Sequence, residues 1–143
     1  MINFISSLNS TSGALDAERT RLEIISQNIA NANTTRGLDG RAYHRQQVVF
    51  ETMLQRARTQ NGGTESMSVP HVSRVMEDPR LGQAIYQPGH PDADPNGMVQ
   101  LPNVNLYEEI ADMIVASRTY DANVAVFKNS RSLAVQALSI GKR

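Results

Sequence analysis

The sequence predicts a mainly α-helical protein in which a small β-rich insertion separates two long terminal helices that pair as an antiparallel coiled coil. Three observations support this fold class. Apolar residues recur every three or four positions at both ends of the chain, no proline or glycine interrupts the stretch from Asn105 to Ile140, and the middle is rich in turn residues. The 143 residues therefore divide into three segments: 1–36, 37–102 and 103–143.

The first segment contains a predicted helix from about residue 3 to residue 32. Its apolar side chains follow the seven-residue repeat of a coiled-coil seam, with Ile25 at an intermediate step: Leu8, Leu15, Leu22 and Ile29. The opening third is rich in Ser and Thr and ends at Gly13, which lowers its helix propensity. Charged residues at three- and four-residue spacing predict a solvated face: Asp16, Glu18, Arg19, Arg21 and Glu23.

The run from Ser26 to Gly37 ends this helix in amides and hydroxyls, with Gly37 available for a left-handed turn. One interpretation is simply a polar helix end. The other is that Asn28 and Asn31, which flank the apolar stripe, donate and accept hydrogen bonds with a neighbouring backbone and thereby fix the register of packing. The residues alone leave both interpretations open.

The middle segment predicts short strands joined by turns. Tyr43 to Phe50 mixes β-branched, aromatic and polar residues and predicts a strand, which the following TMLQRA continues either as strand or as a short helix. Residues 69–75 and 83–86 are further strand candidates, and Pro70 places the first of them at a sheet edge.

Two stretches of the middle segment, Asn61 to Thr64 and Gln87 to Gly97, are dense in turn residues and predict loops. The second stretch resembles the first half of an EF-hand calcium loop, because Asp92, Asp94 and Asn96 precede a glycine. The match then fails, since the twelfth position is not Glu and two prolines lie inside the loop. A turn stabilised by Asx hydrogen bonds is therefore favoured over a metal site.

The last segment predicts a helix with more than one apolar face. Apolar or small residues form one stripe: Ile110, Met113, Ser117, Tyr120, Val124, Phe127, Ala134 and Leu138. A second row lies on a neighbouring face: Val115, Ala122, Val126, Leu133 and Ile140. One partner helix cannot cover both rows, so this helix needs two neighbours. At its start, the carboxylates of Glu108 and Glu109 favour the helix dipole.

Composition excludes several classes of function. Fourteen basic and fourteen acidic residues leave no net charge, which argues against nucleic acid or an anionic membrane as a partner. No cysteine is present, so disulfides, thiolate metal sites and cysteine nucleophiles are excluded. No apolar run is long enough to insert into a membrane, and no cleaved secretory signal is expected. The sequence contains no phosphate loop or nucleophile motif, so we expect no enzyme activity, metal or cofactor.

Both ends of the chain resemble a known family. The stretch ALDAERTRLEIISQNIANANTT, Ala14 to Thr35, resembles the N-terminal motif shared by flagellar basal-body rod, hook and hook-associated proteins. The stretch NVNLYEEIADMIVASRTYDANVAVF, beginning at Asn103, resembles their C-terminal motif. Between them, YHRQQVVFETML, VMEDP and GHPDADPNGMVQLPNVN resemble the proximal rod proteins of this family, whereas Leu38 to Gly40 and the NGGTE stretch match least.

The resemblance implies a structural subunit of the proximal rod in the periplasmic space. Terminal helices of this family pack in an inner tube around the export channel, and the middle segment forms an outer layer. Implied partners are other copies, related rod proteins, the ring-to-rod adaptor and the flagellar type III export apparatus, which exports the chain without a cleaved signal peptide. The positions that match the two motifs are Asn28, Ile29, Ala30, Asn31, Ala32, Asn33 and Thr34, and Ser117, Tyr120, Asn123 and Val124.

Residues and resemblance together predict how subunits associate. Two helices leave the second row of the last helix uncovered, and a repeated, non-closing contact through it gives a helical tube. We expect the terminal helices to provide the interface residues: Leu8, Leu15, Leu22, Ile25, Asn28, Ile29, Asn31, Ile110, Met113, Ser117, Tyr120, Asn123, Val124, Phe127 and Leu138. The alternative is a self-contained helical adaptor or chaperone-like module with a groove for a partner helix. A membrane-surface helix at Met1 to Leu8 is disfavoured, because no Lys or Arg precedes Arg19.

Overall fold

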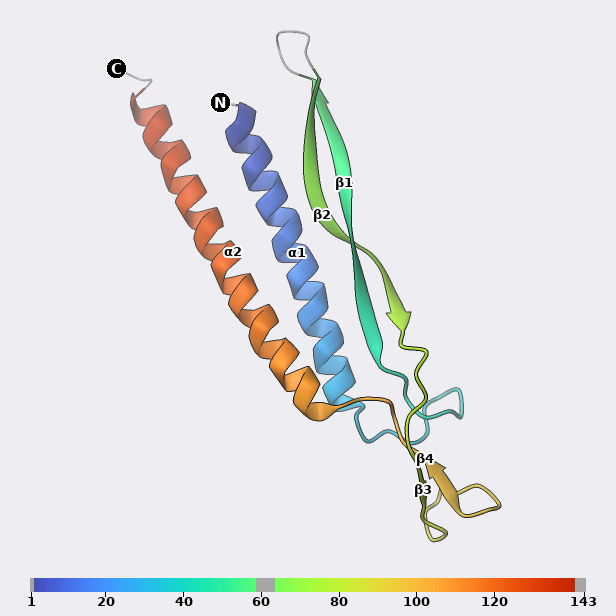
Figure 1. The fold of residues 1–143 in the computed structure, drawn as a ribbon. Helices are drawn as coiled ribbons and strands as arrows, with labels where there is room; N and C mark the ends of the chain where they lie inside the picture. Colours follow the sequence, from blue (N-terminus) through green and yellow to red (C-terminus); the bar gives the residue numbers. More distant parts are fainter. Residues whose placement is uncertain (1, 59–63, 141–143) are drawn as a thin grey trace.

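A computed structural model of the chain describes residues 2–58 and 64–140. The described chain forms two long helices and four strands in two small antiparallel sheets (Figure 1). In chain order these elements are α1 (Ile2–Ala30), β1 (Gln46–Arg58), β2 (Thr64–Glu77), β3 (Ala84–Tyr86), β4 (Met98–Gln100) and α2 (Leu106–Ile140). The predicted fold class is confirmed in its coarse form: two terminal helices with a small β part between them.

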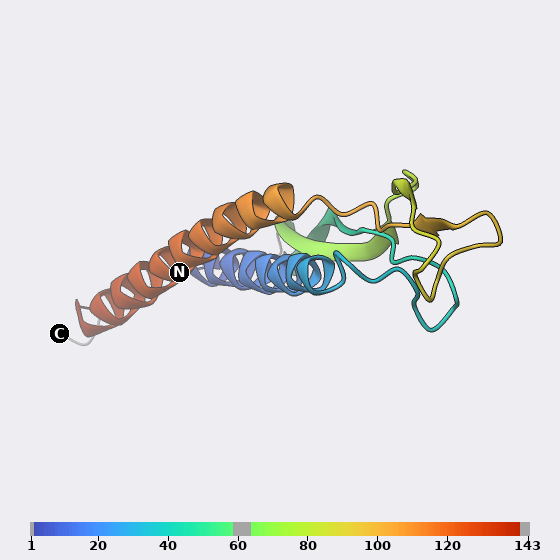
Figure 2. The same ribbon diagram turned by 90° about the horizontal axis from the view of Figure 1, so that it is seen from below.

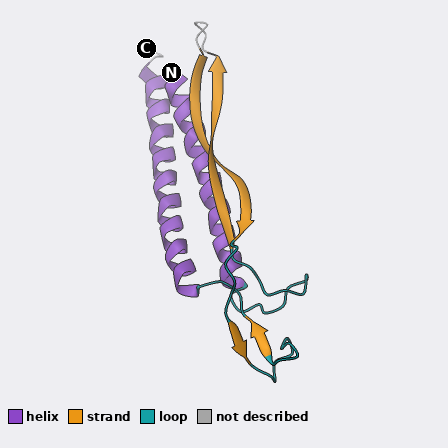
Figure 3. Ribbon diagram, turned by 45° about the vertical axis from the view of Figure 1, so that its right-hand side comes forward, coloured by secondary structure: helices purple, strands orange, loops and turns teal. Residues whose placement is uncertain are grey.

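The molecule is elongated, with α1 lying between α2 on one side and the β1–β2 hairpin on the other (Figures 1 and 3). The two helices run antiparallel, so α1 begins and α2 ends at the same end of the molecule, called here the open end (Figures 1 and 2). The opposite end, called the base, contains the turns and the β3–β4 pair. Neither of the described helices combines the length and apolarity needed to cross a bilayer.

The contact between α1 and α2 buries few large side chains. Ile25 of α1 and Ala116 of α2 are buried, and so is Glu109 in the first turn of α2. The buried positions of α2, Glu109 and Ala116, each lie one residue before a member of the predicted stripe. The stripe members themselves, Ile110 and Ser117, are exposed. The physical reason is that Ala116 lets the backbones approach closely, while Glu109 finds polar partners that a sequence pattern cannot reveal.

The strands β1 and β2 form a long twisted hairpin, paired from Gln46↔Glu77 to Arg58↔Thr64 with a register shift at Val49/Phe50. The predicted first strand was placed too early, since residues 43–45 precede β1 and are held by side-chain hydrogen bonds instead. The ambiguous stretch after residue 50 continues as strand. Pro70 lies in a two-stranded ribbon where each strand has a free edge, as its missing N–H requires. Of the predicted turn, residues 61–63 lie outside the described residues.

The hairpin approaches α1 closely at Gly13. A Cβ atom on Gly13 would lie 2.6 Å from Cγ1 of Val69 and 2.8 Å from the carbonyl oxygen of Pro70. One turn earlier, Oγ of Ser10 donates a hydrogen bond to the carbonyl of Ser68 at 3.1 Å. The glycine that weakens this helix in isolation therefore makes room for the second layer of the fold.

The base is ordered by a second small hairpin. Strands β3 and β4 pair from Ala84↔Gln100 to Tyr86↔Met98, and Val99 is buried. The sequence predicted β3 but not β4. In the loop between them, Oδ1 of Asp94 accepts hydrogen bonds from the backbone N–H groups of Asn96 and Met98, both at 2.8 Å. This Asx turn is the structure that the sequence favoured over a calcium loop.

Candidate functional site: a buried polar joint and uncovered helix faces

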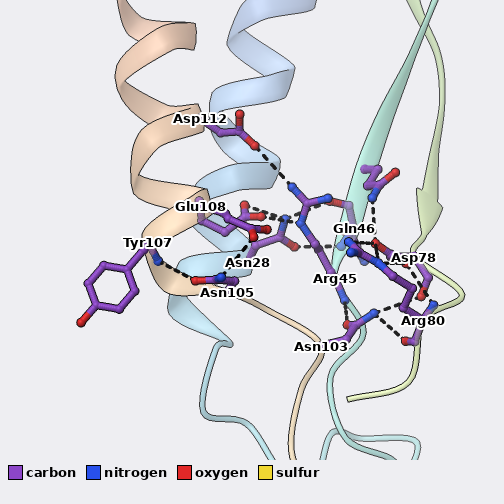
Figure 4. A network of polar contacts seen from close by, with 12 residues as sticks. Asn28, Arg45, Gln46, Asp78, Arg80, Asn103, Asn105, Tyr107, Glu108 and Asp112 are labelled. Atoms are coloured by element: carbon purple, nitrogen blue, oxygen red, sulfur yellow. Dashed lines mark hydrogen bonds and ion pairs between the residues drawn. The ribbon is translucent and has the colours of Figure 1, made fainter. Parts of the chain in front are cut away.

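Asn28 connects three elements at the base (Figure 4). Its Oδ1 accepts hydrogen bonds from the backbone N–H of Gln46 and the hydroxyl of Tyr43, both at 2.9 Å. Its Nδ2 donates to the carbonyl of Gln46 at 2.9 Å and to Oε2 of Glu109 at 3.0 Å. The amide thus pairs with the first residue of β1 as a neighbouring strand would, and all four of its hydrogen-bonding positions are used. The hypothesis that Asn28 binds a neighbouring backbone is confirmed.

Asn31 does not share this role. Its Nδ2 donates to the carbonyl of Gln27 at 2.9 Å, and its Oδ1 accepts from the Thr34 hydroxyl at 3.2 Å. These bonds satisfy backbone and side-chain groups at the end of α1 itself, so the polar-helix-end interpretation is correct for Asn31. The left-handed residue that follows is Gly40, with a φ of 79°, and not Gly37 as expected.

Glu109 holds α2 against the β1 end of the hairpin. Its side chain is fully buried, and its Oε1 accepts a hydrogen bond from Nε of Arg45. The same guanidinium lies 3.4 Å from Asp112, which in turn lies 3.7 Å from Arg21 of α1. Glu109 was expected only to favour the helix dipole, and Arg21 to lie on a solvated face. Both instead belong to an ion-pair network between elements, in which Glu109 has a charged partner and each of its two oxygens accepts a hydrogen bond.

Asp78 closes the network on the β2 side. Its carboxylate accepts hydrogen bonds from Nη2 of Arg80 at 2.6 Å and from the Arg80 backbone N–H at 3.0 Å, and these bonds lower the pKa of Asp78 to about 2. The Asp78 backbone N–H donates to the carbonyl of Arg45 at 2.7 Å. Asn103 accepts from the Arg45 N–H at 2.6 Å and donates to the Arg80 carbonyl at 2.8 Å. The connection into α2 is therefore tied to both strands of the hairpin.

The start of α2 is capped next to this network. Asn105 accepts a hydrogen bond from the Tyr107 N–H, and its Nδ2 donates to Oε1 of Glu108, both at 3.1 Å (Figure 4). The first bond satisfies one of the backbone N–H groups that the first helical turn leaves free, and the second holds the capping amide in place. Together the cap and the network define the polar joint, which consists of Asn28, Tyr43, Arg45, Gln46, Asp78, Arg80, Asn103, Asn105, Glu108, Glu109 and Asp112.

The position of Tyr43 beside Glu109 affects the pKa of its hydroxyl group. Burial, together with the negative charges of Glu109 and Glu77, raises the pKa of Tyr43 above its ordinary value. The hydroxyl therefore stays protonated and can keep donating to Asn28.

A second polar cluster fixes the loop before β4 to the segment after α1. The Thr35 hydroxyl donates to Oδ2 of Asp92 at 2.7 Å, and Arg36 lies 3.4 Å from Oδ1 of the same carboxylate. Nδ1 of His90 accepts a hydrogen bond from the Asp92 N–H at 3.1 Å. The carboxylate oxygens that suggested a cation site are thus engaged with protein groups.

The predicted interface residues occupy three environments. Ile25 and Asn28 are buried within the single chain. Most others are half-buried: Leu8, Leu15, Leu22, Ile29, Asn31, Met113, Tyr120, Asn123, Val124 and Phe127. Three are exposed: Ile110, Ser117 and Leu138. Four members of the second row of α2, Val115, Ala122, Val126 and Leu133, are also exposed, Val126 by 50% and Leu133 by 60%.

The sequence reasoning missed most of the polar joint. Arg45, Asp78 and Asn103 lie in segments that carry no periodic pattern, and, apart from the Asp78–Arg80 pair, their partners named above are 23 to 67 residues away along the chain. A polar residue beside an apolar stripe indicates a buried side chain that needs hydrogen-bond partners. This pattern identified Asn28, and the same pattern at Glu109, next to Ile110, was not used.

Comparison with known proteins matches both ends of the chain and nearly its whole length. Residues 8–36 match the family described as flagella basal body rod protein, and residues 96–140 match the flagellar basal body rod FlgEFG protein C-terminal family. The flagellar basal-body rod protein FlgC of Borreliella burgdorferi is 38% identical, covering 97% of this chain and 98% of that protein. FlgC of Yersinia enterocolitica is 37% identical (90% and 91% covered), and FlgC of Bacillus subtilis is 33% identical (95% and 97% covered).

Proposed function

From the premise that the chain belongs to the family of the flagellar basal-body rod protein FlgC, we propose that it polymerises through its terminal helices into a tube that transmits torque and encloses the export channel. Like its relatives, the chain is a structural subunit of the basal-body rod and not an enzyme. The proposal concerns how the subunit assembles and what the assembly does.

The observation that carries the proposal is the amount of surface that the single chain leaves uncovered. Its accessible surface is 10315 Å², whereas a globular monomer of 15.7 kDa has about 7300 Å². The difference of roughly 3000 Å² reflects the elongated shape and the thin α1–α2 seam (Figure 2). A subunit that completes its core with neighbouring copies has this kind of excess.

The second row of α2 supplies an apolar surface suited to such neighbours. Its members Val115, Val126 and Leu133 are each exposed by half or more. They are spaced by seven and eleven residues, which keeps them along one line of the helix. A contact made through this line with a different face of the next copy is heterologous, and when its rotation does not close a ring, its repetition gives a helical tube.

The proposed partners follow from the same arrangement. Other copies and related rod proteins contact the terminal helices, formed by residues 1–36 and 103–143, while residues 37–102 form the outer layer around them. Further partners are the ring-to-rod adaptor at the membrane side and the type III export apparatus, which passes the chain to the periplasmic space without a cleaved signal peptide. The packing of the hairpin against α1 supports this layering.

The test introduces a charge on the uncovered line of α2. Leu133→Asp should leave the isolated chain as stable as wild type, because the side chain is 60% exposed. In the flagellated organism that encodes the chain, it should abolish incorporation into basal bodies and swimming, since a carboxylate would be buried between copies.

The matched control is Ser132→Asp, about 100° away around the helix on the side that carries Asp121 and Lys128. It should swim normally. Normal swimming and normal basal bodies in the Leu133→Asp strain would contradict assembly through this line.

A further inference from the structure

The charges of α2 are divided between its two halves. Its acidic residues lie in the half toward the base and end at Asp121, whereas Lys128 and Arg131 are the only charged residues from position 122 to Ile140. Residues 2–15 of α1, which lie toward the same open end, contain no acidic residue either (Figure 1). Toward the open end, the two helices therefore supply cations without a carboxylate to balance them.

At the base, Glu108 is an exposed carboxylate that forms no ion pair within residues 2–58 and 64–140. It accepts a hydrogen bond from the Asn105 amide. The pKa of Arg80 is raised by its hydrogen bond and ion pair with Asp78 and also by the charge of Glu108, so this guanidinium already has a partner.

Arg131 is the counterpart of Glu108 in the other half of α2. Its side chain is exposed and forms no ion pair in the part of the chain that the structure describes. A guanidinium and a carboxylate form the stronger kind of charged hydrogen bond when they meet. Each half of α2 thus exposes a charge that its own chain does not pair.

Each of these two charges precedes an exposed apolar side chain by seven residues. Glu108 extends the uncovered line of α2 toward the base, seven residues before Val115, which is 54% exposed. Arg131 lies seven residues before Leu138, which is 57% exposed. Seven residues are about two helical turns. The acidic strip, Glu108 with Val115, therefore has the same length as the basic strip, Arg131 with Leu138.

The two strips lie on different flanks of α2. Twenty-three residues separate Glu108 from Arg131, and the same number separates Val115 from Leu138. This spacing places the strips roughly 140° apart around the helix axis and about 35 Å apart along it. A contact between the acidic strip of one copy and the basic strip of another joins different surfaces, so it is heterologous and can repeat from copy to copy.

Two copies that point the same way can pack side by side either level or staggered. Level packing would place Arg131 beside the uncovered line between Val126 and Leu133, where positions 126, 129 and 133 carry no charge. The guanidinium would then lose water without gaining a carboxylate, which is unfavourable. A shift of 23 residues places Arg131 beside Glu108 and, at the same time, Leu138 beside Val115. Charge complementarity therefore favours the staggered arrangement.

We propose that neighbouring copies pack α2 against α2 with a stagger of about 35 Å, so that Arg131 of one copy pairs with Glu108 of the next. This inference rests on the proposed function and deepens it, because it identifies what covers the base end of the uncovered line and sets the axial offset between copies. A second copy is the occupant because both strips belong to this one chain, and each supplies the charge that the other lacks. An exposed ion pair adds little affinity, and its role here is to fix the register of the contact.

The experiment uses engineered cysteines, because the natural chain contains none. Cells produce tagged and untagged forms of the double variant Glu108→Cys, Arg131→Cys, and mild oxidation is applied to their basal bodies. Within one chain the two positions are about 35 Å apart along a helix, whereas a disulfide needs Cα atoms within about 7 Å. Any disulfide between them therefore joins two copies. We expect a reducible tagged–untagged dimer in which mass spectrometry identifies the linkage from position 108 to position 131.

The matched control replaces Arg131→Cys by Ser132→Cys, which lies at almost the same height but about 100° away around the helix. It should give at least about tenfold less dimer. Each single-cysteine variant should give no dimer. A dimer linked through the same position in both copies would show a symmetric contact and would overturn the proposed pairing.

A charge exchange provides a second readout that needs no cysteine. Arg131→Glu would place two carboxylates together and should lower the amount of chain in basal bodies at least about tenfold. Adding Glu108→Arg should restore it, because the opposite charges then meet again between copies. Adding Asp121→Arg instead keeps the same net charge and should not restore it. If Glu108→Arg also fails to restore incorporation, the partner of Arg131 is not Glu108 of a second copy.

The outcomes separate the inference from the proposed function. If the double-cysteine chain is present in basal bodies without the 108–131 disulfide, or is linked to a different protein, the staggered pairing is overturned while the rod function remains. If the wild-type chain is absent from basal bodies, the proposed function itself fails.

Discussion

The base and the open end of this molecule are built differently, although the same two helices run through both. The side chains that are described as buried lie from the middle of α1 and the first third of α2 toward the base: Ala17, Ile24, Ile25, Asn28, Asp78, Val99, Pro102, Glu109 and Ala116. Toward the open end, Val126, Leu133 and Leu138 of α2 are half exposed or more. The base is held by a satisfied polar network and a small core, whereas the open end is held by a seam of half-buried residues.

This difference shows which part of the fold is stabilised within a single subunit. At the base, hydrogen bonds from Asn28, Arg45 and Asn103 join α1, the hairpin and α2 within one chain. Toward the open end, side chains such as Val126 and Leu133 are exposed by half or more, so they bury less apolar area to offset the conformational entropy of ordering the helix. We therefore expect the base to be folded in the free subunit and the open end to gain much of its stability from neighbours.

The largest expected effect comes from breaking the polar joint. Glu109→Ala would leave the guanidinium of Arg45, only 16% exposed, without its buried carboxylate and would remove an acceptor from Asn28. Removing one partner of a buried pair costs about 3–5 kcal/mol. Urea unfolding of the purified chain, followed by circular dichroism, measures this loss.

Two further variants keep the joint prediction testable if Glu109→Ala does not fold. Glu109→Gln retains an acceptor for Asn28 and should lose less stability. Glu108→Ala removes a neighbouring exposed carboxylate that accepts a hydrogen bond from the capping side chain of Asn105, and should cost about 1 kcal/mol or less. Equal losses for Glu108→Ala and Glu109→Ala would contradict the view that the buried pair of Glu109 and Arg45 stabilises the base.

A smaller effect is expected where the hairpin meets α1. Gly13→Ala would bring a methyl group within 2.8 Å of the Pro70 carbonyl oxygen, a backbone atom that moves only with β2. Overpacking costs about 1–3 kcal/mol, and the better helix propensity of Ala returns about 1 kcal/mol. Amide hydrogen exchange should become faster in residues 69–76 and remain unchanged in residues 20–28.

Gly89→Ala is the control for this prediction, because no atom lies within 4 Å of its added Cβ. It should leave hydrogen exchange as in wild type. Unchanged exchange in β2 of the Gly13→Ala variant would mean that the close approach does not hold the hairpin in place.

The smallest effect concerns pH. Hydrogen bonds from Arg80 lower the pKa of Asp78 to about 2, below its ordinary value of 3.8. A carboxyl with a lowered folded-state pKa stabilises the fold above its unfolded pKa, and this contribution is lost as pH falls from about 4 toward about 2. The contribution is modest, because Arg80 is 67% exposed and solvent screens the pair.

The measurement is the difference in unfolding midpoint between wild type and Asp78→Asn at several pH values. The difference should be constant above pH about 4 and shrink between pH about 4 and about 2. A difference that does not change over this range would show that the Asp78 carboxylate contributes no pH-dependent stability.

The sequence predicted the parts of the fold that depend on local periodicity. The seven-residue spacing of Leu8, Leu15, Leu22 and Ile29 identified α1, and the uninterrupted stretch after Asn105 identified α2. Asn28 was recognised as a candidate register residue because an amide beside an apolar stripe is costly unless it is bonded. Such inferences succeed because the relevant neighbours are three, four or seven residues away.

The parts that could not be predicted depend on distant residues. The choice of Glu109 over Ile110 for the buried face follows from Arg45, 64 residues earlier, and from Asn28, 81 residues earlier. The hairpin also packs closely against Gly13, a contact between distant residues that strand propensity does not reveal. The predicted contacts between subunits stay predictions, because they involve surfaces of more than one chain.

Both helices have their outer ends at the open end, and the base is made of internal turns. The subunit therefore has a direction, and copies related by a helical operation all point the same way. A tube built from such copies is polar: one rim exposes helix ends, and the other exposes the β3–β4 hairpin and the capped start of α2 (Figure 1). Because the two rims differ chemically, a protein that begins the tube and a protein that extends it must recognise different surfaces. The orientation of the chains in the tube therefore determines the order in which such proteins add.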